Sequence, residues 1–161
     1  MIKKIFISLL FIALTTTNSI SAGSSDSGSS KTKYDIAVSH IKAAKEFESQ
    51  DNSKEAKKKY KKAQKLLIQS NKKFPNKADT LNYLGFTTRK LGDYKNGEKY
   101  YLEGLAIDPT HIGINEYLGE LYVATNRVNL AKERLEILKT CNCEEYDELK
   151  AVIDGKKESK Y

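Results

Sequence analysis

The sequence has no tryptophan, only two prolines and two cysteines, and no apolar run long enough to cross a membrane. Its N-terminal apolar run, Ile5–Leu14, has about ten residues, whereas a membrane-spanning helix needs roughly twenty. No cysteine directly follows the small residues that end at Ala22, so a lipid anchor has no attachment point there. These absences argue against a transmembrane anchor and against a lipoprotein.

The N-terminal segment has the layout of a secretory signal peptide. Lysines precede the apolar run, and polar and small residues ending at Ser21 or Ala22 follow it. We therefore predict a cleavable signal peptide over residues 1–22 and a periplasmic or secreted protein, in a compartment that permits disulfides. Residues 23–33, GSSDSGSSKTK, are rich in serine and glycine, a composition that predicts a disordered linker. A single folded domain over about 34–155 is expected to follow.

An internal repeat is the main structural signal. The tripeptide Tyr-Leu-Gly at Tyr83 returns 34 residues later at Tyr117. When the two segments are laid on one another, the positions with a structural role agree. The expected packing positions are Leu84, Gly85, Thr88, Gly97, Tyr101 and Gly104 in one segment and Leu118, Gly119, Tyr122, Ala131, Leu135 and Leu138 in the other. Each segment is predicted to form an αα-hairpin.

The expected turns carry their own signals. Gly92 stands where a helix ends with a positive φ, and the equivalent residue is Asn126, the next best choice for that conformation. Asp93 is expected to cap the helix that follows it, and Thr110 the helix after Pro109.

These features resemble the tetratricopeptide repeat (TPR) family. The segment 78–111 supplies the positions that the family pattern asks for: Leu81, Leu84, Gly85, Gly92, Tyr94, Tyr101 and Pro109. It departs from the pattern at Thr88, where the family has tyrosine, and at Gly97 and Gly104, where the family has alanine. The two glycines indicate either sequence drift away from the family pattern or a flat strip on the helix surface, on which Phe86 or Tyr83 packs closely.

The resemblance implies an all-α fold, a right-handed α-solenoid of about three helix-turn-helix repeats closed by a C-terminal capping helix. The segment CNCEEYDELK, from Cys141, also resembles the closing segment of small exported TPR proteins of bacteria. The repeats are expected over about 37–77, 78–111 and 112–143 and the capping helix over about 143–154. Asn142 and Glu145 are predicted to form its capping box, and residues 156–161 a frayed tail.

The first repeat is longer than the others. Ala56, Tyr60 and Ala63 match the second-helix pattern, but the closing proline is delayed by seven residues, to Pro75. Seven residues make about two helical turns, so the added stretch keeps the same face toward the core. The spacing predicts one long helix from about Lys54 to Lys73.

Reactive side chains are few. His40 and His111 have no serine, cysteine or carboxylate at a motif spacing, and no phosphate-binding loop, zinc-protease pattern or nucleophile elbow is present. We therefore predict a protein that is not an enzyme, with no catalytic residue, metal site or cofactor. Cys141 and Cys143 are expected to form a structural disulfide, and the alternatives are redox or intermolecular use and, last, a metal site.

The segment 53–74 carries nine lysines and one glutamate. Such a run is usually a solvated face, and the alternative interpretation is attraction to an anionic envelope surface. Nucleic acid is not expected as a partner, because export would separate the protein from it and the segment has no arginine for bidentate phosphate recognition.

In TPR arrays the first helices line a concave groove that holds a peptide or partner segment. Carried over by position, the resemblance implies that the partner-binding residues are Asn82, Phe86, Arg89, Lys90, Glu116 and Glu120, with Val38, Ile41, Lys45, Glu48, Asp79 and Val123 beside them. Leading among the hypotheses is a non-catalytic periplasmic protein-interaction module. The alternatives are an oligomeric or envelope-surface-associated protein that uses the lysine-rich helix 54–73, and a thiol-redox protein that uses Cys141 and Cys143.

Overall fold

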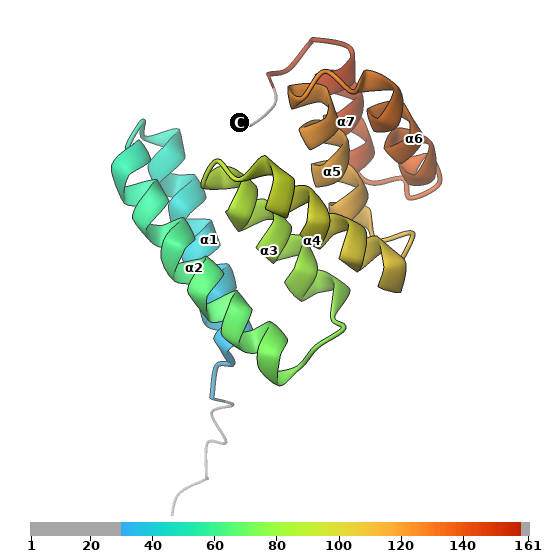
Figure 1. Cartoon of the computed structure of the whole chain (residues 1–161). Coiled ribbons are helices and arrows are strands. Elements are labelled where there is room, and N and C mark those ends of the chain that lie inside the picture. Colours follow the sequence, from blue (N-terminus) through green and yellow to red (C-terminus); the bar gives the residue numbers. More distant parts are fainter. Residues whose placement is uncertain (1–29, 159–161) are drawn as a thin grey trace, which may run out of the picture.

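The computed structural model describes residues 30–158. The predicted signal peptide, most of the predicted linker and the last three residues therefore lie outside the described part of the chain. Within residues 30–158 there are seven helices and no strand, which confirms the all-α prediction (Figure 1). The helices are α1 Lys33–Ser49, α2 Ser53–Lys73, α3 Ala78–Lys90, α4 Tyr94–Ile107, α5 Ile112–Ala124, α6 Val128–Leu138 and α7 Glu144–Ile153.

The long helix expected over residues 54–73 is present as α2, which has 21 residues. Its buried residues are Ala56, Tyr60, Ala63, Leu67 and Ser70, which repeat every three or four positions and so face one side. Asn52 begins the helix by accepting a hydrogen bond from the amide of Glu55, 3.3 Å away. The delayed proline therefore lengthens this helix without rotating its apolar face away from the core.

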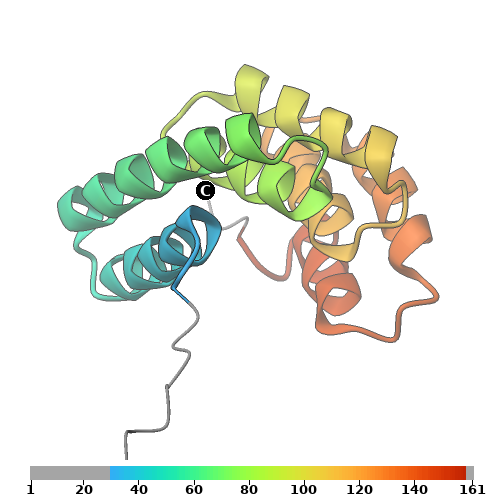
Figure 2. The same cartoon turned by 90° about the horizontal axis from the view of Figure 1, so that it is seen from below.

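The helices contact only near neighbours in the chain. Within residues 30–158, each helix packs on the next one, and further contacts join α1 to α3, α3 to α5 and α5 to α7. The even-numbered helices α2, α4 and α6 do not contact one another in this way. Figure 2 shows the helices following a curved path, with α1 and α7 on its inner side.

The buried residues form two neighbouring clusters. One joins α1, α2 and α3 through residues that include Ile41, Tyr60 and Leu84. The other joins α4, α5 and α6 through residues that include Tyr101, Leu118 and Ala131. Of the positions that the repeat assigns to packing, Leu135 is only half-buried, and the others are buried: Leu84, Gly85, Thr88, Gly97, Tyr101, Gly104, Leu118, Gly119, Tyr122, Ala131 and Leu138. Full burial of a leucine side chain contributes about 1.5–3 kcal/mol to the free energy of unfolding, so these positions stabilise the helix pairs.

Two glycines allow helices to cross closely. A Cβ atom at Gly85 would overlap the ring of Tyr101 on α4, and one at Gly119 would overlap the side chain of Leu149 on α7. For Gly97 and Gly104, the alternative to drift is a strip that packs on Phe86 or Tyr83, and the structure gives both glycines other neighbours. Gly97 faces Arg89 and the carbonyl of Gly85, and Gly104 faces Ile114, rather than Phe86 or Tyr83.

The helix ends confirm part of the predicted turn chemistry. Gly92 and Asn126 have φ angles of 94° and 60°, and Asp93 Oδ1 accepts a hydrogen bond from the amide of Asn96 at 3.1 Å. The prediction that Thr110 caps the next helix is wrong, because the N-cap of α5 is His111, whose ring accepts from the amide of Ile114.

The predicted capping box at Asn142 is also wrong. Asn142 has a φ of 49° and the N-cap position of α7 is Cys143, which makes no side-chain capping bond. A residue in the left-handed conformation turns the chain between α6 and α7, so the helix begins one position later.

Cys141 and Cys143 form a disulfide in this turn, with Cα atoms 5.2 Å apart. We expect replacement of both cysteines by serine to lower the free energy of unfolding by only about 1–2 kcal/mol, because so short a loop removes little entropy from the unfolded chain. Urea unfolding of both proteins, with and without a reductant, measures the difference. A loss above about 3 kcal/mol would contradict this local role.

Candidate functional site

An open pocket of about 850 Å³ is lined by α1, the start of α2, α3, α5 and the segment after α7. We call it the α1–α3–α5 pocket. Its lining residues are Lys45, Glu48, Asp51, Ser53, Phe86, Lys90, Tyr117 and Glu158. The sequence places them by helical spacing: Phe86 and Lys90 are four residues apart on α3, and Lys45 and Glu48 are three apart on α1, so each pair shares one helix face.

Two aromatic rings and one lysine form the apolar side of the pocket. The rings of Phe86 and Tyr117 are 4.9 Å apart between centroids and tilted by 37°, a geometry typical of attractive aromatic pairs. The Nζ atom of Lys45 lies 4.9 Å from the Phe86 centroid and 3.3 Å from the Tyr117 hydroxyl, to which it donates. Burial raises the pKa of Tyr117 well above its usual range, so the hydroxyl stays protonated.

A series of polar side-chain contacts forms another part of the pocket wall. Lys90 Nζ pairs with Glu48 Oε1 at 2.7 Å, and the Tyr60 hydroxyl donates to Glu48 Oε2 at 2.8 Å. Burial, followed by the hydrogen bond to Glu48, raises the pKa of Tyr60. Glu48 is therefore held by α2 and α3 at once, which fixes Glu48 and Lys90 in position.

A buried charge cluster lies beneath the aromatic rings. Arg89 Nη1 donates to the carbonyl of Tyr117 at 2.6 Å, and Nη2 lies 3.6 Å from Glu120 Oε2, with both side chains fully buried. The guanidinium also lies 5.4–5.9 Å from the ring centroids of Phe86, Tyr117 and Tyr101. Burial lowers the pKa of Arg89, an effect that Tyr101 and Glu120 oppose.

The prediction that the partner-binding residues face an open groove is wrong for four of them, because their side chains are buried. Arg89 is 1% exposed, Glu120 0%, Glu116 5% and Asn82 6%. Phe86 is also buried but lies at the edge of the pocket, which it lines together with Lys90. Of the neighbouring positions, Lys45 and Glu48 line the pocket, whereas Ile41 is buried in the core and Val38 and Val123 are half-buried elsewhere.

Asn82 packs inside the structure. Its Nδ2 group lies where a side chain at Gly113 would have to fit. Its Oδ1 atom is buried and has no hydrogen-bond partner within residues 30–158. The amide therefore belongs to the contact between α3 and α5 in this conformation.

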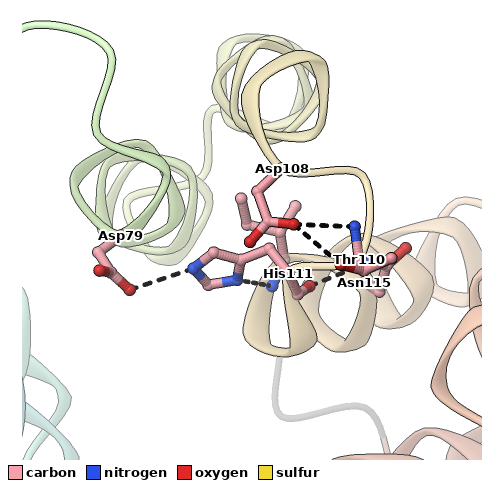
Figure 3. A network of polar contacts seen from close by, with 6 residues as sticks. Asp79, Asp108, Thr110, His111 and Asn115 are labelled. Atoms are coloured by element: carbon pink, nitrogen blue, oxygen red, sulfur yellow. Dashed lines mark hydrogen bonds and ion pairs between the residues drawn. The ribbon is translucent and has the colours of Figure 1, made fainter. Parts of the chain in front are cut away.

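His111 and Asp79 join the starts of α3 and α5 in a second polar network (Figure 3). His111 Nε2 lies 3.1 Å from Asp79 Oδ1, and Nδ1 accepts from the amide of Ile114 at 3.2 Å. In the same network Asn115 Nδ2 donates to the carbonyls of Pro109 and His111, both at 3.1 Å. Because both ring nitrogens of His111 are engaged, the network serves to hold the helix starts together.

Several pocket residues were beyond the reach of the repeat pattern. Tyr117 had one sequence signal, an aromatic residue directly before each Leu-Gly pair. Asp51 comes from the turn before α2, Ser53 is the first residue of α2, and Glu158 comes from the segment after α7. Such positions carry no periodic signal, because turns and tails do not repeat the helix spacing.

Comparison with known proteins finds no family model that matches the chain and no curated protein that is significantly similar to it. Within residues 30–158, no three His, Cys, Asp or Glu side chains are grouped so as to hold a metal ion. No helix of that part is both long and apolar enough to span a membrane.

Proposed function

We propose that this chain is a non-catalytic protein-interaction module that holds a peptide or protein segment in the α1–α3–α5 pocket. The observation that carries the proposal is the pocket itself, with a cavity of about 850 Å³, since ligand sites commonly measure 300–1,000 Å³. Its lining combines apolar rings with charges of both signs, Lys45 and Lys90 against Glu48, Asp51 and Glu158. Such a lining suits a peptide with an apolar side chain flanked by charged groups.

We also propose that the helices form a short right-handed α-solenoid of the TPR type. The support comes from the repeat of 34 residues, from the contacts that reach only neighbouring helices, and from the buried glycines. In such an array the odd-numbered helices line the concave side, which agrees with a pocket lined from α1, α3 and α5. The binding proposal depends on the pocket rather than on the family.

A periplasmic location is part of the proposal and has its own test. It rests on the signal-peptide layout of residues 1–22, which lie outside the described structure. Cell fractionation and N-terminal sequencing of the purified protein should recover a chain that begins near residue 22 or 23. Recovery of the full-length chain from the cytoplasm would contradict this location.

The binding proposal predicts a position-dependent cross-link in cells. A photoreactive amino acid in place of Lys45, which lines the pocket, is expected to form a discrete adduct with one protein partner. The same amino acid in place of the exposed Lys132 on α6 serves as the control and is expected to form none. Gel electrophoresis and mass spectrometry measure the adducts.

A charge change inside the pocket makes this test specific. Reversal of Asp51, an exposed lining residue, to lysine is expected to abolish the adduct while leaving the helical circular dichroism unchanged. Equal adducts at positions 45 and 132, or an adduct that survives the reversal, would contradict binding in the pocket.

A further inference from the structure

We propose that the outer face of α2 binds an anionic lipid bilayer surface. Eight lysines on this helix are exposed, and six of them form one stripe: Lys54, Lys57, Lys58, Lys61, Lys65 and Lys72. At 100° per residue they fall within about a third of the helix circumference, and they extend for about 27 Å along its axis. We call them the lysine stripe. The face opposite to it contains the buried residues Ala56, Tyr60, Ala63 and Leu67.

The charge of α2 differs from that of the other even-numbered helices. The sequence of α2 has nine lysines and one glutamate, whereas α4 has two lysines and two glutamates and α6 has two basic and two acidic residues. A solvent-exposed helix face that is stabilised by its own ion pairs alternates charges of both signs. Among the even-numbered helices, the excess of positive charge is therefore confined to α2.

Ion pairs do little to neutralise the stripe. Within residues 30–158, the only ion pair of an α2 lysine joins Lys58 to Glu55, with the nitrogen and oxygen 2.6 Å apart. Lys54 with Lys58, Lys57 with Lys61, and Lys61 with Lys65 are like charges four residues apart, a spacing that destabilises a helix. An external anionic surface would relieve this repulsion.

The position of the stripe suits a flat partner. α2 lies at the end of the array that is opposite to α7 (Figure 1), and it packs only on α1 and α3 among the described helices. Ile68 lies in the stripe between Lys65 and Lys72 and is 49% exposed. An apolar side chain between lysines can enter the boundary between headgroups and acyl chains. Lysine alone, without arginine on this helix, fits attraction to the field of a charged surface better than bidentate recognition of single phosphates.

Vesicle binding by the purified protein tests the proposal. We expect it to sediment with vesicles of phosphatidylcholine and phosphatidylglycerol at low salt, not with vesicles of phosphatidylcholine alone, and to dissociate as salt rises. Replacement of Lys61, Lys65 and Lys72 by glutamine should lower the affinity about a hundredfold, since each lysine near such a surface contributes roughly a fivefold factor. The matched control replaces the exposed Lys95, Lys99 and Lys132 of α4 and α6 by glutamine, which changes the net charge equally. It should lower the affinity less than about threefold.

Ile68→Ser separates a bilayer from a soluble polyanion. The substitution leaves the charge unchanged and is expected to weaken vesicle binding several-fold, while binding to polyphosphate stays the same. Equal losses in the two lysine triple variants, no binding to anionic vesicles, or an Ile68→Ser variant with unchanged vesicle affinity would each overturn the proposal. Circular dichroism confirms that the variants keep their helices.

Discussion

Replacement of Arg89 by methionine is expected to lower the free energy of unfolding by about 3–5 kcal/mol, measured by urea unfolding. Arg89 and Glu120 are both fully buried and 3.6 Å apart, and the guanidinium also donates to the carbonyl of Tyr117. Removal of the arginine leaves the carboxylate of Glu120 in a region from which water is excluded. The loss arises from keeping that carboxylate buried without the guanidinium more than from the attraction between the two groups.

Two further variants make the prediction about Arg89 specific. Arg127 pairs with Glu98 through two hydrogen bonds of 2.8 Å, but its side chain is 36% exposed. Its replacement by methionine should therefore cost about 1 kcal/mol or less. The double variant Arg89→Met with Glu120→Leu should be more stable than Arg89→Met alone, because it removes both charges. An Arg89→Met loss no larger than that of Arg127→Met would contradict the burial argument.

Gly85→Ala is expected to destabilise the protein by about 1–3 kcal/mol, although alanine is favoured over glycine within a helix by about 0.5–1 kcal/mol. The added methyl group would overlap the ring of Tyr101. That ring is fully buried, so it cannot move aside without displacing its neighbours.

Gly97→Ala provides the matched comparison for Gly85→Ala. A Cβ atom at Gly97 would lie 3.1–3.3 Å from the Cβ and amide nitrogen of Arg89 and the carbonyl oxygen of Gly85, a close contact that overlaps no aromatic ring. We expect its effect on the free energy of unfolding to stay below about 1 kcal/mol, because the helix preference offsets the crowding. Thermal and urea unfolding of the two variants measure the difference. Equal effects would show that the contact with Tyr101 does not limit this position.

The repeat made the helices predictable because it reports local chemistry. Gly92, Asp93 and Asn126 belong to turns whose conformation depends on a few consecutive residues, and each behaves as its residue type indicates. The start of α5 was less predictable, since Thr110 and His111 can both accept a hydrogen bond from a helix amide. Asp108 accepts hydrogen bonds from the amide and hydroxyl of Thr110, which leaves His111 at the capping position.

The candidate site was harder to predict because burial depends on how neighbouring helices are rotated. Residues at the groove positions of α3 and α5 share a helix face with pocket residues, yet Arg89 and Glu120 meet each other under the rings of Phe86 and Tyr117. A single sequence shows which residues share a face of one helix. It does not show which of them a second helix covers, and a charged residue is seldom fully buried unless it is paired.

The neighbour-only contacts make the pocket sensitive to the end of the helical array. α1 contributes Lys45 and Glu48 to the pocket but packs only on α2 and α3 among the described helices, and a hydrogen bond from Lys45 to the Tyr117 hydroxyl links it to α5. In such an array a terminal pair can open locally while the rest stays folded. Each opening of α1 and α2 would remove one wall of the pocket, so a ligand held there would slow hydrogen exchange first in α1. The lifetime of the bound state would then be limited by the end pair rather than by global unfolding.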